Sequence, residues 1–296
     1  MNTASGRAET PPCRIISRSV ECVRDARLER RADDLAVEEP LEIQIMLGPR
    51  DAREVKTVSI TMRTPGHDRE LATGFLIGEG LLRSCDHVEE VVQRGANSVR
   101  VVLRANVMMN LKRLERNCYT TSSCGVCGKT SIEALGIASF PALGGAEWQV
   151  DEKVIRSLPA RLREGQDVFQ HTGGLHAAGL FTPVGEAIVV REDVGRHNAV
   201  DKVIGMSFLK EKEFHASSLL VVSGRASFEL MQKALAAGIP MLVAVGAPSS
   251  LAVEVAEKFG ATLIGFTKPE SFNIYTGSGR VRIGAGLLAY EHQSDS

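Results

Sequence analysis

Two cysteines three residues apart, Cys124 and Cys127, are the strongest chemical signal in the sequence, in the run Ser-Ser-Cys-Gly-Val-Cys-Gly-Lys. Two thiols at this spacing can bind one metal ion together, or one can attack a sulfur atom that the other carries. Residues 130–135 are predicted to begin a helix, and the positive end of that helix, together with Lys129, favours the thiolate form. The residues alone leave three interpretations open: a sulfur-accepting thiolate, half of a zinc site and an incidental pair.

A zinc site would need further ligands, because a closed structural site has four. The chain has no second pair of this spacing, although Cys118 and several histidines could supply ligands. Zinc deaminases combine H-x-E with P-C-x-x-C. This chain has His87-Val88-Glu89 but carries Ser123 in place of the proline, so we interpret the triplet as a solvated charged segment. A thioredoxin-like redox role would require a strand before the pair in a βαβ pattern, which is missing here.

Polar loops follow four apolar segments in the C-terminal half, at residues 191–198, 223–227, 246–250 and 267–277. Loops that follow parallel strands meet at the carboxyl edge of the sheet, where ligands bind. Three of the loops lead directly into predicted helices, whose N-termini favour anions. Arg196 and Arg225 can form paired hydrogen bonds with phosphate. The loops therefore predict a pocket for a phosphorylated ligand. The lack of a Walker A or G-x-G-x-x-G sequence argues against a generic ATPase or a Rossmann dehydrogenase.

Two histidines, His171 and His176, lie on either side of the pair Gly173-Gly174. They could bind a metal, carry protons or donate hydrogen bonds within a turn. One histidine alone would usually be structural, but two flanking a glycine pair make a functional interpretation equally reasonable.

The N-terminal half is predicted to be α+β, because alternating apolar residues at 41–47, 57–62 and 99–103 are typical of half-buried strands. A helix with an apolar stripe of Leu71, Phe75 and Leu76 lies between the second and the third of these strands. In the C-terminal half, apolar strands at 187–191, 219–222, 241–245 and 263–266 alternate with helices. This alternation predicts an α/β part with a mostly parallel sheet and helices on both faces.

The totals describe a globular chain of 296 residues, 44% hydrophobic, with a formal net charge of −1. The charge gives no reason to expect nucleic acid or an anionic membrane as a partner, and no apolar run has the length of a membrane helix. Six cysteines without a secretory signal are expected to be reduced thiols in a cytoplasmic protein. We predict a disordered tail at 1–33, an α+β domain at 34–120 and an α/β domain carrying the cysteine pair at 121–296.

Several segments together resemble one family, the formate dehydrogenase accessory sulfurtransferases known as FdhD. They are Arg-Thr-Pro-Gly at 63–66, Glu-Leu-Ala-Thr-Gly-Phe at 70–75, the cysteine run, Thr-Gly-Gly-Leu-His-Ala-Ala at 172–178, and residues 191–202, 223–233 and 246–251. The resemblance extends from about Asp34 to about Tyr290 and leaves out the N-terminal tail.

The resemblance implies a mechanism. A cysteine desulfurase would place sulfur on Cys124 as a persulfide, and Cys127 would relay the sulfur or protect the thiolate. The acceptor would be molybdenum in the bis(molybdopterin guanine dinucleotide) cofactor, bound as a substrate, and formate dehydrogenase would become active after this step. The chain would then be a sulfurtransferase without a permanently bound metal.

The resemblance also places the cofactor near the C-terminus. The implied cofactor-binding residues are Phe272, Asn273, Ile274, Tyr275, Thr276 and Gly277, which join Arg196 and Arg225 from the loops. It further implies a cytidine deaminase-like fold for the C-terminal part, without deaminase chemistry, and a homodimer.

Overall fold

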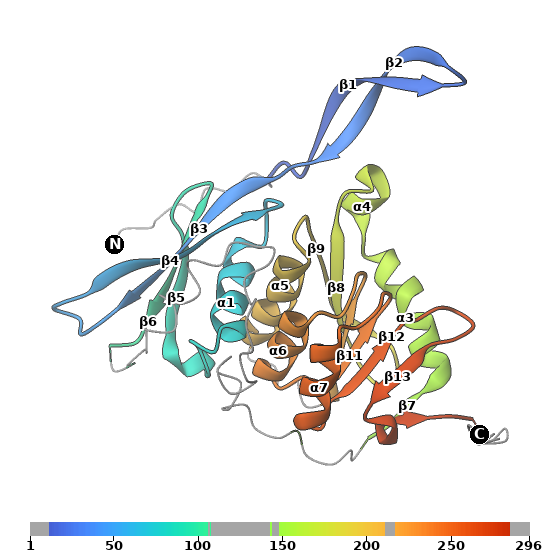
Figure 1. Cartoon of the computed structure of the whole chain (residues 1–296). Coiled ribbons are helices and arrows are strands. Elements are labelled where there is room, and N and C mark those ends of the chain that lie inside the picture. Colours follow the sequence, from blue (N-terminus) through green and yellow to red (C-terminus); the bar gives the residue numbers. More distant parts are fainter. Residues whose placement is uncertain (1–11, 106, 108–142, 144–147, 211–216, 285–296) are drawn as a thin grey trace.

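The computed structural model describes residues 12–105, 107, 143, 148–210 and 217–284. Two β-sheets lie on opposite sides of a layer of helices, and a long hairpin projects from the body (Figure 1). The N-terminal elements, in chain order, are β1 Ile15–Arg24, β2 Arg27–Ala36, β3 Glu39–Leu47, β4 Glu54–Arg63, α1 Asp68–Gly78, the 3₁₀ helix η1 Cys85–His87, β5 Val88–Gln93 and β6 Ser98–Leu103.

The first sheet has the strand order β4-β3-β6-β5, in which only the β3–β6 pair is parallel. Its inner face carries fully buried Leu41, Ile43 and Ile45 from β3, with Val99 and Val101 from β6. These side chains share one apolar cluster with α1. The strands and the helix predicted for this part of the chain are therefore confirmed.

The remaining elements form the second sheet and the helices that cover it. They are β7 Val150–Asp151, α3 Glu152–Glu164, α4 Asp167–Thr172, β8 His176–Phe181, β9 Ala187–Asp193, α5 Arg196–Leu209, β10 Leu219–Val222, α6 Phe228–Ala236, β11 Met241–Ala244, α7 Ser250–Lys258, β12 Thr262–Gly265, β13 Asn273–Thr276, the 3₁₀ helix η4 Ser278–Arg280 and β14 Val281–Arg282. The short strands β7 and β14 pair with each other in parallel.

The second sheet has the order β13-β12-β11-β10-β8-β9. The neighbours β10–β11 and β11–β12 are parallel, whereas β8 is antiparallel to β9 and to β10, and β13 is antiparallel to β12. The predicted α/β class is confirmed, but the sheet is mixed rather than mostly parallel. The difference arises because β8 and β13, the two strands that run opposite to the other four, were not among the predicted strands.

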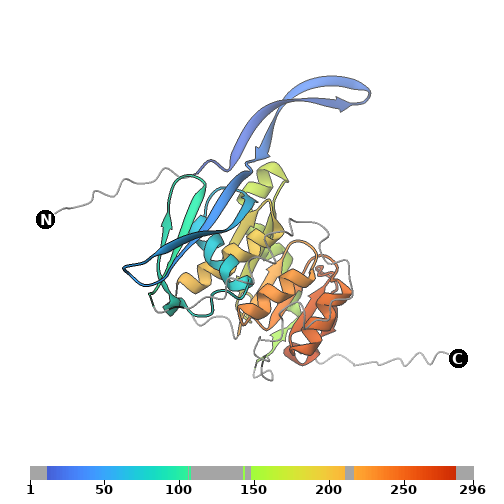
Figure 2. The same ribbon diagram turned by 60° about the vertical axis from the view of Figure 1, so that its left-hand side comes forward.

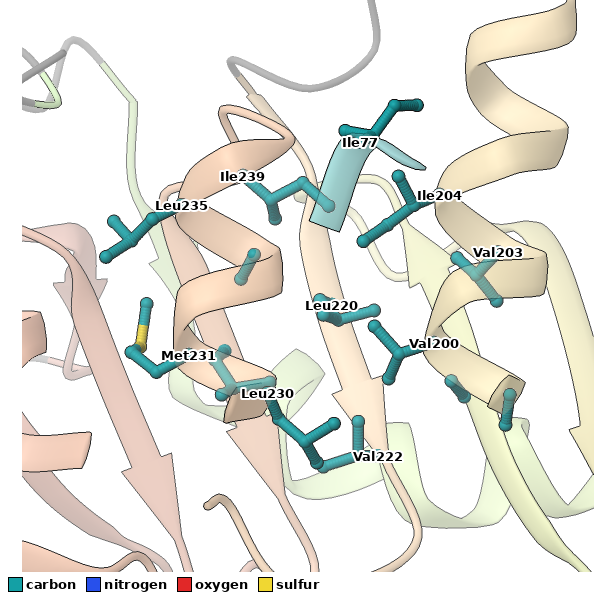
Figure 3. Close-up of a cluster of buried hydrophobic side chains, with 14 of the residues drawn as sticks. Ile77, Val200, Val203, Ile204, Leu220, Val222, Leu230, Met231, Leu235 and Ile239 are labelled. Carbon is teal, nitrogen blue, oxygen red and sulfur yellow. The ribbon is translucent and has the colours of Figure 1, made fainter. Parts of the chain in front are cut away.

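Helices cover both faces of this sheet, as predicted. Leu220 and Val222 of β10 point toward α5 and α6 and belong to the larger apolar cluster (Figure 3). Leu219 and Val221 alternate with them and belong to a second cluster with Leu158 of α3. Because successive strand residues face opposite sides, a strand that is buried on both faces is apolar throughout.

The larger cluster is continuous from Leu41 in the first sheet to Leu263 in the second. The parts predicted as two domains therefore share one core. The predicted boundary between residues 120 and 121 lies outside the described residues. No helix in the described ranges is long and apolar enough to cross a membrane.

The tail predicted for residues 1–33 is wrong from Ile15 onward, because β1 and β2, of ten residues each, form an antiparallel hairpin. Both views show this arm projecting away from the body (Figures 1 and 2). Its two faces lie in solvent, so its sequence lacks the one-sided apolar pattern that identifies a strand. Its turn places Asp25 and Ala26 at positive φ without the glycine that usually marks such a turn.

Candidate functional site

The loops after β9, β10, β11 and β12 lie at one edge of the second sheet. β8 is antiparallel to both β9 and β10, so β9 runs in the same direction as β10, and β11 and β12 are parallel to β10. The carboxyl ends of all four strands therefore point to the same edge, which we call the loop edge. The predicted gathering of these loops is confirmed, as are the helices α5, α6 and α7 that begin from three of them.

Backbone hydrogen bonds fix two of these loops to each other. The N–H of Gly246 donates to the carbonyl oxygen of Gly224 at 2.9 Å, and the N–H of Ala226 donates to Ala247 at 3.1 Å. A Cβ atom at Gly246 would lie 3.0 Å from the Gly224 oxygen, so a side chain there would force the loops apart by a few tenths of an ångström. The loop edge is thus a joined surface rather than a set of separate loops.

Most cations in the motif segments are used inside the fold. Four of these cations form ion pairs: Arg63 with Asp68 at 2.9 Å, Arg191 with Glu70 at 2.6 Å, Lys202 with Asp193 at 2.7 Å and Lys233 with Asp201 at 2.8 Å. Buried charges need such partners, because an unpaired charge in the interior is costly. These side chains therefore position the loop edge and are not free to bind a ligand.

Asp193 organises the start of α5. Its carboxylate accepts hydrogen bonds from the N–H groups of Thr64 at 3.2 Å and Gly195 at 2.8 Å, and from the side-chain amide of Asn198 at 3.1 Å. The ammonium of Lys202 completes this shell, and burial lowers the pKa of Lys202 against the opposing attraction of Asp193. This carboxylate therefore ties the N-terminus of α5 to the loop that follows β4.

Arg196 and Arg225 differ from the paired cations. Arg196 is the first residue of α5 and is partly exposed, while Arg225 is exposed in the loop between β10 and α6. Neither makes an ion pair or a side-chain hydrogen bond with another residue of the described ranges. Both lie at the loop edge, where two helix N-termini also lie, and this arrangement suits an anionic ligand. Their role in binding remains a prediction.

The two histidines that flank the glycine pair are separated in the structure. Nδ1 of His171 lies 2.7 Å from the carbonyl oxygen of Asp167 within α4, which gives this side chain a structural contact. His176 is the first residue of β8 and lies at the loop edge. Burial, followed by the charges of Arg196 and His197, lowers the pKa of His176, which favours the neutral imidazole.

The predicted stretch 272–277 runs along the edge strand β13. Asn273 pairs with Gly265 at the loop edge, whereas Thr276 pairs with Leu263 toward the opposite edge. The hydroxyl of Thr276 donates to the carbonyl oxygen of Ala261 at 2.8 Å. The residues 272–277 therefore do not form one compact site. Only the first of them lie beside the loops that carry Arg196 and Arg225. The binding role of residues 272–277 is a prediction as well.

A pocket with a volume of about 540 Å³ opens between the loop edge and the helices α3 and α4. Arg163, Gln166 and Phe169 line it from the helical side, and His176 and Ser223 line it from the sheet. Sequence reasoning missed the helical wall. Apolar residues at helical spacing in α3, Ile155, Leu158 and Leu162, could have revealed the helix that forms it.

Cys124, Cys127 and Cys118 lie outside the described residues. Glu89 of the H-x-E triplet forms an ion pair with Arg53 at 2.7 Å, as expected for a charged surface segment. The part of the chain that the structure describes contains no group of three or more His, Cys, Asp or Glu side chains able to hold a metal ion.

Comparison with known proteins gives a consistent result. The model of the FdhD/NarQ family matches residues 36–282. A relative from Streptomyces avermitilis, named sulfur carrier protein FdhD, is 45% identical over 285 residues, covering 90% of this chain and 96% of the relative. A relative of the same name from Saccharolobus solfataricus is 42% identical, covering 88% of this chain and 95% of the relative.

A solved structure is similar in fold. It is a formate dehydrogenase accessory protein from Desulfotalea psychrophila, with a TM-score of 0.71 and 24% sequence identity, and the match covers 90% of this chain and 99% of that one. At this identity the likeness concerns the fold alone.

Proposed function

Because the chain belongs to the FdhD/NarQ family, we propose that it is a sulfur carrier that takes sulfur from a cysteine desulfurase and passes it to the molybdenum cofactor of formate dehydrogenase. The cofactor, bis(molybdopterin guanine dinucleotide), is a substrate that the chain binds and modifies. The observation that carries the proposal is the pair Cys124 and Cys127 in a chain 45% identical to a protein named as a sulfur carrier.

The sulfur-accepting step balances with one thiolate. The Cys124 thiolate attacks the outer sulfur of the persulfide on the donor, a new S–S bond forms, and the old S–S bond breaks to release the donor as a thiolate. Delivery of that sulfur as sulfide requires two electrons. Cys127 can supply them by attacking the inner sulfur of Cys124, which closes a disulfide as the sulfide leaves; a cellular dithiol then reduces the disulfide.

The loop edge has the chemistry that the cofactor would require. A dinucleotide brings several phosphates, and the N-termini of α5 and α6 lie beside Arg196 and Arg225, which have no ion-pair partner in the described ranges. Arg191, Lys202 and Lys233 are already neutralised by Glu70, Asp193 and Asp201. The unpaired arginines are therefore the groups that we propose to contact phosphate.

The length of the chain allows the cysteines to reach this edge. Leu143 donates a backbone hydrogen bond to Phe259 at 3.2 Å, near the end of α7 that is remote from the loop edge. The nine residues of α7 span roughly 14 Å. The segment between Cys127 and Leu143 could extend to roughly 50 Å, so its length does not restrict the thiols to either end of the sheet.

The proposal is tested by restoring formate dehydrogenase activity in cells that lack this chain. The unchanged chain and a Cys22→Ala variant, altered on the projecting arm, should both restore activity, whereas Cys124→Ala should restore none. Unfolding curves should show that Cys124→Ala is folded. Full activity with Cys124→Ala would contradict the proposal.

A further inference from the structure

The projecting arm, residues Ile15–Ala36, has no covering layer in the described part of the chain. Both views show it extending away from the body (Figures 1 and 2). A two-stranded hairpin that stands alone in water is at best marginally stable. The family model begins to match only at residue 36, so the arm precedes the part of the chain that the model describes. Such an arm indicates a surface that packs against another molecule.

Strand β2 of the arm has a free edge. It pairs with β1 on one side, and no strand in the described ranges pairs with it on the other. The unpaired N–H and C=O groups of such an edge can bind a further strand. Proteins often protect free edges with a proline or a bulge, but β2 contains no proline and its pairing with β1 has no register shift. The edge is therefore open to a partner strand.

The order of charges along β2 is complementary to itself. Residues 30–34 read Arg-Arg-Ala-Asp-Asp, with two cations before Ala32 and two anions after it. In an antiparallel pair of two copies with a two-fold axis at Ala32, Arg31 lies opposite Asp33 of the second copy, and Arg30 lies opposite Asp34. The symmetry repeats both pairs on the other side of the axis. Directly opposite side chains share a face and lie close enough for ion pairs.

Other registers lack this complementarity. A two-fold axis at Arg31 or at Asp33 would place two like charges opposite each other, which is destabilising. The free edge of β1 is also unsuitable. Its charges Arg18, Glu21 and Arg24 are three residues apart, so neighbouring opposite charges point to opposite faces and cannot meet across a two-fold axis. The charges therefore select one strand and one register.

The charged groups of this run make only solvent-accessible contacts within one copy. These contacts are Arg30 with Glu21 at 3.4 Å, Arg31 with Asp33 at 3.8 Å, and Asp34 with the hydroxyl of Ser17. Exposed ion pairs contribute little to stability. The four side chains can therefore form pairs with a second copy without the loss of any buried contact.

The same register covers the apolar tip of the arm. Val23 and Leu28 lie opposite each other near the turn and are 71% and 64% exposed. The register places Leu28 beside Ala36 of the second copy. The Cβ atom of Ala36 lies 3.6 Å from the position that a Cβ atom at Gly174 would occupy, so this face of β2 is turned toward the segment that follows α4. Each tip would thereby lie against the body of the other copy.

We propose that two copies of this chain associate through the free edges of their β2 strands, about a two-fold axis at Ala32. The strands form a four-stranded antiparallel sheet in the order β1-β2-β2-β1. The family resemblance implies a homodimer, but this surface lies before the part of the chain that the family model matches. The proposal goes beyond sulfur transfer and depends on neither the cysteine pair nor the cofactor.

The test is the mass of the full chain in solution, measured by size-exclusion chromatography with light scattering over a range of concentrations. The acidic variant carries Arg30→Asp with Arg31→Asp, and the basic variant carries Asp33→Arg with Asp34→Arg. The exchanged variant carries all four substitutions, which restores complementarity with the signs reversed. Arg83→Asp with Arg94→Asp, at two exposed positions of the body, is the control that matches the charge change of the acidic variant.

The unchanged chain, the control and the exchanged variant should be dimers. The acidic and basic variants should each dimerise about 100-fold or more weakly, because four attractive pairs become repulsive. An equimolar mixture of these two variants should form dimers that contain one copy of each. The exchanged variant and the unchanged chain, mixed with different tags, should not form a mixed dimer, because like charges would then lie opposite each other. If the acidic or basic variant fails to fold, this sorting decides.

A monomeric unchanged chain would overturn the proposal and would leave the arm to a different protein. Acidic and basic variants that dimerise as well as the unchanged chain would overturn it too, since the interface would then lie elsewhere. Free formation of mixed dimers between the exchanged variant and the unchanged chain would exclude this register.

Discussion

A Cβ atom at Gly205 in α5 would lie 1.8 Å from the carbonyl oxygen of Glu70 in α1, so the two helices cross with their backbones in contact. The same relationship holds in reverse, because a Cβ atom at Gly74 in α1 would lie 1.8 Å from the carbonyl oxygen of Asp201 in α5. This crossing joins the first sheet to the helix that begins at the loop edge.

Gly205→Ala should destabilise the protein by about 3 kcal/mol or more, because the helices would have to move apart in a packed core. Chemical denaturation gives the free energy of unfolding. The matched control is Gly279→Ala, where a Cβ atom would meet nothing within 4 Å. Equal stability of the two variants would show that the helices do not approach this closely.

The ion pair between Arg191 and Glu70 should make stability depend on acid pH. Burial alone would raise the pKa of Glu70, but the hydrogen bonds and charge of Arg191, with a further contribution from His67, hold this pKa at about 2, against an ordinary value of 4.5. Because the folded chain holds this proton less strongly than the unfolded chain, the contribution is full above about pH 4.5 and is lost as pH falls toward 2. After a discount for the partial exposure of Glu70, this contribution to the free energy of unfolding is about 1–2 kcal/mol.

Glu70→Gln should therefore lower the free energy of unfolding at pH 7, and its difference from the unchanged chain should shrink between pH 4.5 and pH 2. Denaturation series across this range measure the difference. Glu254→Gln, on the exposed side of α7, is the control. A difference that stays constant down to pH 2 would mean that the ion pair does not lower the pKa of Glu70.

Lys233→Met should cost about 3–5 kcal/mol of stability, because it leaves the buried Asp201 without its cation. Burial already raises the pKa of Asp201 to about 6 with Lys233 in place. The double variant Asp201→Asn with Lys233→Met should recover a large part of the loss, since the buried position 201 then carries no charge; the more exposed Glu79, 3.9 Å from the Lys233 ammonium, loses its cation in both variants. A double variant no more stable than Lys233→Met would show that packing, rather than charge, accounts for the effect.

Arg225→Gln should weaken binding of GDP by about 5- to 10-fold, since a charge-assisted hydrogen bond to phosphate would be lost. The loss should be smaller at high salt, because exposed charges are screened. Stability should not change, since Arg225 is exposed. Arg83→Gln provides a comparison with another exposed arginine. Equal affinities for the two variants at low salt would remove Arg225 from the site.

The apolar strands were predictable because burial dictates their composition. Strand β10 was located to the residue, since Leu219–Val222 is buried on both faces. By contrast, the alternation of Val58, Ile60 and Met62 predicts that all three side chains face the core. The register shift in the β3–β4 pair instead leaves Ile60 and Met62 exposed and turns Thr61 toward Asn198. A register shift depends on pairing with another strand, which local periodicity does not contain.

The candidate site shows the same division. Arg191 and Arg196 lie five residues apart in one motif segment, and nothing in the sequence indicates which of the two has an ion-pair partner. Only the fold shows that Glu70 neutralises Arg191, while Arg196 has no such partner in the described ranges. The pocket wall also depends on distant segments: Gln166 and Ser223 line the same pocket only because α3 and α4 pack on the sheet. Spacing along the chain can identify candidate residues, but their ion-pair partners and neighbours are set by the tertiary structure.

The most direct test of the central claim follows one labelled sulfur atom. The chain is incubated with a cysteine desulfurase and ³⁵S-cysteine, separated from both, and then mixed with formate dehydrogenase that carries unsulfurated cofactor. The account predicts label on Cys124 first, by peptide mass spectrometry, and then in the cofactor, with simultaneous gain of formate oxidation. Cofactor that acquires label equally well from the Cys124→Ala variant would contradict the account.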